Sequence, residues 1–237
     1  MSDQITDIYA LEEQKVTELR NAQNKAEQLF RETEARGLIR AGISESRLNE
    51  DIYELAKEIF GITTYWHKRI VRAGANTLLP YDDNPPDHTL REDEILFLDL
   101  GPVFEEYEAD FGRTFVIGSD PAKLKMRDDV AKAFADGKRY FHENPEIRAD
   151  EFFAYAVSLA EKYGWEFGGP IAGHLIGHFP HERIPKDKIT LYVHPESTLP
   201  MCSTDENGRK RHWILEIHFV DRKLQIGGFF EELLTVS

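Results

Sequence analysis

The chain has 237 residues, a length that suits one large domain or two small ones. Its formal net charge of −14 argues against a nucleic-acid partner and against binding to an anionic membrane, because both require a basic surface. The single cysteine, Cys202, excludes an intrachain disulfide, and the acidic, polar N-terminus lacks a signal-peptide pattern, so a cytoplasmic protein is expected.

The first part of the chain is expected to be helical. Apolar residues recur at helical spacing over residues 16–30, and Gly37 is the expected stop of that helix. A second helix follows, with Ser44 or Ser46 as its N-cap and Gly61 as its end.

The remaining elements are expected in the order two strands, two helices and three strands, after a loop-rich stretch. They cover residues 95–100, 113–118, 121–142, 150–163, 189–193, 213–220 and 229–236. Asp150 is the expected N-cap of the second of these helices. One α+β domain over residues 15–237 is the simplest architecture, with residues 1–14 as an N-terminal extension.

Two aspartates flank the predicted turn in LDLGPVFEEYEADFGRTF. Asp99 ends one apolar strand and Asp110 precedes the next. If the strands form a hairpin with its midpoint between Phe104 and Glu105, the two carboxylates face each other at one end of the ladder. Two ionised carboxylates so close repel each other, and one would take up a proton unless a cation lay between them.

Two glutamates repeat this arrangement near the C-terminus. Glu216 in WILEIHFVD and Glu231 in GGFFEELLTV have their midpoint in a polar turn, between Lys223 and Leu224. Either acid pair alone is explained more simply by solvated carboxylates at a strand edge. Two such pairs together with a histidine cluster favour a metal site.

The segment GGPIAGHLIGHFPHERIP contains His174, His178 and His181. Its glycines and prolines disfavour the helix on which His174 and His178 would form a zinc pair. His174 follows Gly173, which allows close backbone approach, and is therefore the expected ligand. His178 is interpreted as a surface or loop residue.

Together, the two acid pairs and the histidine segment resemble those of a family, the pita-bread metallopeptidases (M24). It includes methionine aminopeptidase, Xaa-Pro aminopeptidase and prolidase, with creatinase as a non-peptidase relative. The resemblance covers about residues 15–236 and rests on the motifs LDLGPVFEEYEADFGRTF, AGHLIGHFPHERIP, ILEIHF and FFEELL. The spacings from Asp99 to Asp110 and from His174 to His181 match the family. The implied fold is α+β, a curved antiparallel sheet in two pseudo-symmetric halves with helices on its outer face.

The resemblance implies a two-metal site. Asp99 would bind one ion through both oxygens, and Asp110 and Glu231 would bridge the two ions. His174 and Glu216 would complete the shell of the second ion. Such an oxygen-rich ligand set favours Mn²⁺ or Fe²⁺, with Co²⁺ and Zn²⁺ as alternatives.

The resemblance also implies the chemistry, hydrolysis by metal-activated water. His181 would hydrogen-bond the substrate carbonyl or the tetrahedral intermediate, and Glu216 would carry a proton toward the leaving amine. Arg113 would have a supporting structural role. The expected function is that of an aminopeptidase or Xaa-Pro-type peptidase acting on a short peptide or other small molecule, as a monomer or homodimer. The alternatives are hydrolysis of a non-peptide C–N or amide bond, as in creatinase, and a non-catalytic binding module.

The substrate side departs from the family pattern. Tyr81 stands where the peptidases usually have a substrate-binding histidine, and Pro170 replaces another histidine. Two interpretations are open: Tyr81 contacts the substrate, or Tyr81 packs in the loop and His67 supplies the missing imidazole. His218 shares a strand face with Glu216 and is a further candidate for the lining of the substrate pocket.

Overall fold

The chain runs twice through the same series of elements, a pair of helices followed by three sheet strands. The computed structural model describes residues 2–179, 189–205 and 208–236. Its helices are α1 (Ser2–Ala35), α2 (Glu45–Phe60), α3 (Pro121–Glu143) and α4 (Ala149–Tyr163). Its sheet strands are β1 (Ile70–Ala73), β2 (Ile95–Leu100), β5 (Phe111–Val116), β6 (Glu166–Phe167), β7 (Ile214–Asp221) and β8 (Ile226–Leu233). The smaller elements are β3 (Val103–Phe104), β4 (Tyr107–Glu108) and the 3₁₀ turns η1 (Gly74–Leu78) and η2 (Ile189–Leu191).

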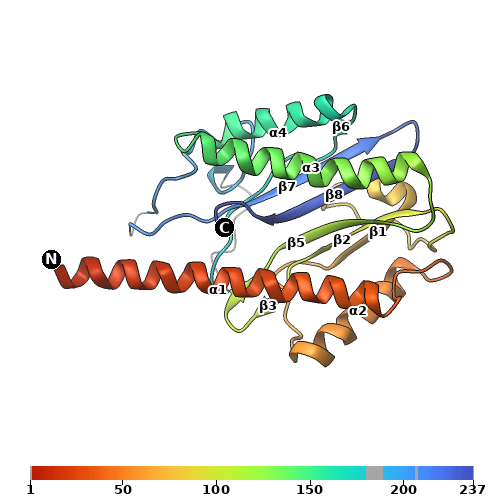
Figure 1. Ribbon diagram of the computed structural model, residues 1–237, viewed down its shortest axis with the longest axis horizontal. Coiled ribbons are helices and arrows are strands. Elements are labelled where there is room, and N and C mark those ends of the chain that lie inside the picture. The colour runs from red at the N-terminus through yellow and green to blue at the C-terminus, as the bar shows by residue number, and fades with distance from the viewer. Residues whose placement is uncertain (1, 180–188, 206–207, 237) are drawn as a thin grey trace.

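Six strands form one antiparallel sheet in the order β1-β2-β5-β8-β7-β6. The first strand of each half lies at an edge, and the last strands, β5 and β8, meet at the centre. The sheet is therefore pseudo-symmetric, which confirms the predicted arrangement. Figure 1 shows α1 and α2 along the β1-β2-β5 half and α3 and α4 along the β7-β8 half. Among the described residues, no helix has both the length and the apolar character of a membrane-spanning segment.

Each half has its own hydrophobic core between its helices and its strands. In β2, Leu96, Leu98 and Leu100 pack with α1 and α2. The intervening Phe97 and Asp99 face the opposite side of the sheet, because side chains alternate along a strand. That side carries a small apolar cluster of Ile70, Phe97 and Phe229. The face away from the helices is thus where the acidic side chains gather.

Local signals set most helix ends. Ser44 caps α2, its side chain accepting a hydrogen bond from the Arg47 backbone N–H, and Gly61 ends the helix in the left-handed conformation. Helix α1 is longer than predicted and runs without a break across the predicted boundary between residues 14 and 15.

Two predicted features are wrong. Asp150 does not cap α4, because Arg148 holds the N-cap position, and the backbone N–H groups of Ala149 and Asp150 donate to carbonyls of residues 197–199 instead. The predicted strand over residues 189–193 is replaced by the 3₁₀ turn η2, in which the Tyr192 N–H donates to the Ile189 carbonyl. At the start of α4, hydrogen bonds to a distant segment satisfy the backbone N–H groups. At residues 189–192, a hydrogen bond within a turn replaces the expected pairing with another strand.

Candidate metal centre

One row of positions crosses the centre of the sheet and carries three acids. Asp99 on β2 pairs with Gly112 on β5, Gly112 with Glu231 on β8, and Glu231 with Glu216 on β7. The predicted register of the C-terminal hairpin is therefore confirmed, since Glu216 and Glu231 face each other. Only glycine fits at position 112 in this row, because a Cβ there would lie 2.5 Å from the Phe229 ring.

The predicted register of the first hairpin is wrong by two residues. Asp99 faces Gly112, and Asp110 lies just before β5. The reason is the turn, which centres between Glu105 and Glu106 because Phe104 pairs with Tyr107. The two aspartates still converge, since His67 contacts both of them.

His174 reaches Asp110 from a segment that runs beside β7. The backbone N–H of Ile214 donates to the His174 carbonyl, and a Cβ on Gly173 would lie 2.2 Å from the Ile214 carbonyl oxygen. The imidazole Nδ1–H donates to the Leu175 carbonyl at 2.7 Å, and Nε2 lies 3.0 Å from Asp110 Oδ2. The close backbone approach expected at Gly173 is what delivers this ring.

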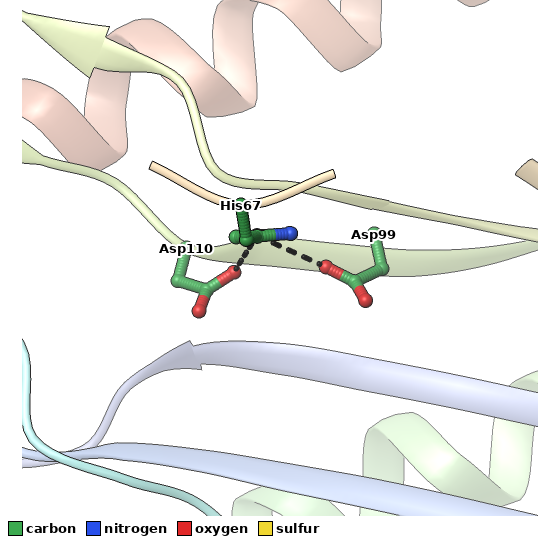
Figure 2. Close-up of side chains that lie close together, drawn as sticks. All are labelled: His67, Asp99 and Asp110. Atoms are coloured by element: carbon green, nitrogen blue, oxygen red, sulfur yellow. Dashed lines mark hydrogen bonds and ion pairs between the residues drawn. The ribbon is translucent and has the colours of Figure 1, made fainter. Parts of the chain in front are cut away.

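His67 is a second imidazole at the same centre (Figure 2). Its Nε2 lies 3.1 Å from Asp110 Oδ1 and 3.5 Å from Asp99 Oδ1, and its side chain is only 7% exposed. The sequence predicts His67 on the substrate side and outside the ligand set, because a long loop-rich segment separates it from Asp99. The one signal available was TYWHKRI, a histidine beside aromatic residues just before the β1 strand.

Burial is the largest influence on the carboxylates of this cluster. It raises the pKa of Asp99 to about 7 and the pKa of Glu216 to about 8, and it raises the pKa of Glu231 well above the usual range, with the neighbouring carboxylates adding to the effect on Glu231. Burial also opposes ionisation of Asp110, but the nearby charge of His67 and hydrogen bonds from both imidazoles lower its pKa to about 2. Asp99, Glu216 and Glu231 therefore bind protons strongly unless a cation takes the place of those protons.

The neighbouring carboxylates raise the pKa of both imidazoles. Burial by itself would lower the pKa of His67, but the charges of Asp110 and Asp99 raise it to about 9. The pKa of His174 is raised as well, because Asp110 outweighs the burial. The carboxylates of the cluster therefore stabilise positive charge beside them.

The donor atoms fit divalent cations. In each of two groups, His67 with Asp99 and Asp110, and Asp110 with His174 and Glu231, the ligating atoms lie within 4.8 Å of one another. Asp110 belongs to both groups and directs one oxygen at each imidazole. Oε2 of Glu231 is buried and has no hydrogen-bond partner among the described residues. A buried carboxylate oxygen without a hydrogen-bond partner is expected of a metal ligand, because the cation takes the place of that partner.

We expect the thermal stability of the protein in chelator to fall as pH rises from about 6.5 to 8, above the range in which the lowered pKa of His218 acts in the opposite direction. Asp99, Glu216 and Glu231 have pKa values raised in the folded state, so their stabilising contribution is complete below the unfolded pKa and is lost toward the folded pKa. His67, also raised, acts in the same direction between about pH 6.5 and 9. Each net proton contributes about 1.4 kcal/mol per pH unit. Thermal unfolding at several pH values measures this slope.

Two controls belong to that experiment. Glu216→Gln removes one titrating group and should flatten the slope, and an excess of Mn²⁺ should reverse it, because metal binding favours the ionised ligands. A stability that is constant or rises between pH 6.5 and 8 in chelator would contradict the pKa shifts.

Tyr81 and His218, which were predicted to contact the substrate, lie beside the metal centre and in the core, respectively. Tyr81 is half-exposed beside the centre, with its ring 5.8 Å from that of His67 and its hydroxyl accepting a hydrogen bond from the Lys68 N–H. His218 is buried between Phe97 and Phe229 and donates from Nε2 to the Thr77 carbonyl. Burial lowers the pKa of His218 to about 4, so its ring is neutral and holds η1 against the sheet.

The remaining residues singled out in the sequence are Arg113, His178 and His181. Arg113 lies on the outer side, between the rings of Phe111 and Phe230, where it pairs with Glu232 and donates to the Glu231 carbonyl. His178 is exposed and contacts Glu106. His181 lies outside the described residues.

Comparison with known proteins points to one family. The family model described as metallopeptidase family M24 matches residues 17–207. The Xaa-Pro dipeptidase of Pyrococcus horikoshii is 28% identical over 114 residues, 48% of this chain and 32% of that protein. The Xaa-Pro dipeptidase of Lactobacillus helveticus is 28% identical over 145 residues, 61% of this chain and 39% of that protein. The matched segments thus span less than half the length of either relative.

Solved structures are similar over nearly the whole chain. Prolidase from Thermococcus sibiricus superposes with a TM-score of 0.75 at 21% identity, covering 95% of this chain and 57% of that one. The Xaa-Pro dipeptidase from Bacillus anthracis gives 0.72 at 19% identity, with 94% and 61% covered. This chain therefore spans less than two thirds of either. The likeness confirms the pita-bread fold implied by the sequence motifs.

Proposed function

Because the chain belongs to metallopeptidase family M24, we propose that it is a peptidase that holds two divalent cations between its two hairpins and hydrolyses short peptides. The proposed substrates are those of an aminopeptidase or an Xaa-Pro-type peptidase, since two of its relatives are named Xaa-Pro dipeptidases. Mn²⁺ or Fe²⁺ is the proposed native metal, because carboxylates dominate the centre.

The observation that carries this proposal is the division of Asp110 between two clusters. Oδ1 and Oδ2 of this buried carboxylate face different imidazoles, and each side holds a further carboxylate, Asp99 or Glu231. One carboxylate shared in this way supports a two-metal centre with Asp110 as the bridge. The unpartnered Oε2 of Glu231 supports the same assignment.

Some side chains of the centre would bind the cations, and one would transfer a proton. When bound, the two cations would lower the pKa of water and polarise the scissile carbonyl. Asp99, Asp110, Glu231 and His174 would hold them in place. Glu216, whose pKa burial raises to about 8, can hold and release a proton near neutral pH and would pass one to the leaving amine.

Two measurements test the proposed function. Metal analysis of protein purified without chelator should find about two equivalents of a transition metal. Kinetics on a panel of Met-Xaa and Xaa-Pro peptides should then find metal-dependent hydrolysis that chelator abolishes. Protein that carries and takes up no divalent metal would refute the proposal.

The second candidate is hydrolysis of a non-peptide C–N or amide bond by the same centre. The observation that favours it is Tyr81, a half-exposed phenol beside the centre. A phenol donates a hydrogen bond but stays neutral at pH 7, so it is a poor proton shuttle. If the second candidate is correct, metal-dependent hydrolysis of the simple peptides will be weak. A kcat/KM above about 10⁴ M⁻¹s⁻¹ on any of them would remove this candidate.

His181→Ala is expected to lower kcat by about 10²–10³-fold and to leave the metal content unchanged. The proposed role of His181 is a hydrogen bond to the substrate carbonyl in the transition state, which is worth about that factor. Steady-state kinetics together with metal analysis of the same preparation measures both. A parallel loss of metal and rate would make His181 a ligand instead.

A further inference from the structure

His67 and His174 make matching contacts on opposite oxygens of Asp110. Each ring donates Nδ1–H to the carbonyl of the residue that follows it, at 2.7 Å in both cases. Each directs Nε2 at Asp110, His67 at Oδ1 (3.1 Å) and His174 at Oδ2 (3.0 Å). A carbonyl only accepts hydrogen bonds, so Nδ1 carries a hydrogen in both rings, and a metal ion can take the place of the proton on Nε2, as is usual for histidine ligands.

We propose that His67 is a metal ligand, so that each cation of the centre has one imidazole. His67 would bind the cation held by Asp99 and Oδ1 of Asp110, and His174 the cation held by Oδ2 of Asp110 and Glu231. This inference rests on the proposed two-metal function. It differs from the interpretation that His67 replaces the substrate-binding histidine of the family, since His67 then contacts the cation and not the substrate.

The backbone holds His67 in this position from two sides. The segment before it runs beside the end of β2, where the Trp66 N–H donates to the Gly101 carbonyl and the Val103 N–H to the Thr64 carbonyl. The Trp66 indole N–H donates to the Ala109 carbonyl, next to Asp110. The ring is thereby fixed to the two chain segments that carry its aspartate partners.

Gly101 provides the space that the imidazole occupies. A Cβ at this position would lie 2.2 Å from Cδ2 and 2.4 Å from Nε2 of His67. The ring therefore fills the volume in which any larger residue would place its side chain. A ring seated this tightly is suited to a fixed ligand more than to a group that follows a substrate.

A substrate-binding role fits these contacts poorly. The His67 side chain is 7% exposed, and both of its nitrogens already have partners inside the protein. Tyr81 lies edge-on to the ring at 5.8 Å and is itself half-exposed. Between the two, Tyr81 is the residue that a substrate can reach.

A second imidazole changes the metal preference of the centre. Imidazole suits Fe²⁺, Co²⁺ and Zn²⁺, whereas carboxylates and water suit Mn²⁺. We expect His67→Gln to weaken the binding of one Co²⁺ equivalent by at least about tenfold, the lower end of the effect of losing a group that merely supports a ligand. The affinity for Mn²⁺ should fall less.

The test uses the full chain, stripped with chelator and loaded with two equivalents of Co²⁺. In proton NMR spectra, the Nδ1–H of each cobalt-bound imidazole gives an exchangeable, strongly shifted resonance, which ¹⁵N-histidine labelling identifies. Wild type should give two such resonances, and His67→Gln and His174→Gln should each lose a different one. His178→Gln, which removes an exposed histidine paired with Glu106, should keep both. Calorimetric titration with Co²⁺ and Mn²⁺ supplies the affinities.

The outcomes separate this inference from the proposed function. Two equivalents bound with a single imidazole resonance in wild type would overturn the role of His67 and leave the two-metal centre standing. The same holds if His67→Gln keeps both resonances and the wild-type Co²⁺ affinity. Wild type that binds no Co²⁺ would overturn both. If His67→Gln does not fold, the count of resonances in labelled wild type still decides.

Discussion

Glu231→Gln is expected to abolish the binding of both metal ions, reducing the metal content from about two equivalents to near zero, because the family resemblance implies that Glu231 bridges the two ions together with Asp110. Glu231 lies at the centre of the sheet, where it pairs with Gly112 on one side and Glu216 on the other. Its Oε2 is buried without a hydrogen-bond partner among the described residues, and the glutamine amide replaces one carboxylate oxygen with a group that does not bind cations. Asp110→Asn should have the same effect. Metal analysis after loading and desalting measures both.

The neighbouring glutamate offers a matched control. Glu232 points to the other face of the sheet and pairs with Arg113, so Glu232→Gln should keep its metal. In chelator, Glu231→Gln should unfold at a temperature no lower than wild type, because burial already raises the pKa of Glu231 well above its usual range and keeps it protonated. This separates loss of ligand from loss of fold. Wild-type metal affinity in Glu231→Gln would exclude the bridging role.

Gly173→Ala is expected to destabilise the protein by about 2–6 kcal/mol, combining overpacking with backbone strain. The added Cβ would lie 2.2 Å from the Ile214 carbonyl oxygen, a backbone atom in the strand that carries Glu216. The glycine also has a φ of +137°, which L-residues rarely adopt. Because His174 follows directly, any shift that relieves the contact moves this ligand.

Thermal unfolding and metal titration of the same variant test this expectation. The melting temperature should fall by roughly 5–20 °C for a chain of this size. Gly61→Ala is the control, since Gly61 also has a positive φ but nothing within 4 Å of the added Cβ. It should lose only about 1–2 kcal/mol. Equal effects of the two substitutions would show that the contact with Ile214 is unimportant.

The C-terminal hairpin shows what local pattern can determine. Glu216 and Glu231 sit in apolar strands around a short polar turn, so their pairing follows from the position of the turn, and the structure has it as predicted. The same holds for helix α2, whose ends are set by Ser44 and Gly61. In each case the deciding interactions lie within a few residues along the chain.

The first hairpin shows where local pattern fails. The stretch from Gly101 to Ala109 contains no Asn-Gly or Asp-Gly pair to fix its turn, and a shift of the midpoint by one residue moves the register by two. Asp99 consequently faces Gly112 rather than Asp110. The acid types and their order were readable from the sequence, but their mutual positions were not.

The acids and His174 of the centre, its two hairpins and the resemblance to a metallopeptidase family could all be read from the order of the amino acids. Only the tertiary structure placed His67 against Asp110, because that contact depends on the segment before β1 lying beside the end of β2. No periodicity or spacing encodes such a contact, since it joins a residue just before β1 to a residue just before β5, far apart along the chain. The contact depends on the packing around Gly101, where the His67 imidazole occupies the space that a side chain at position 101 would need.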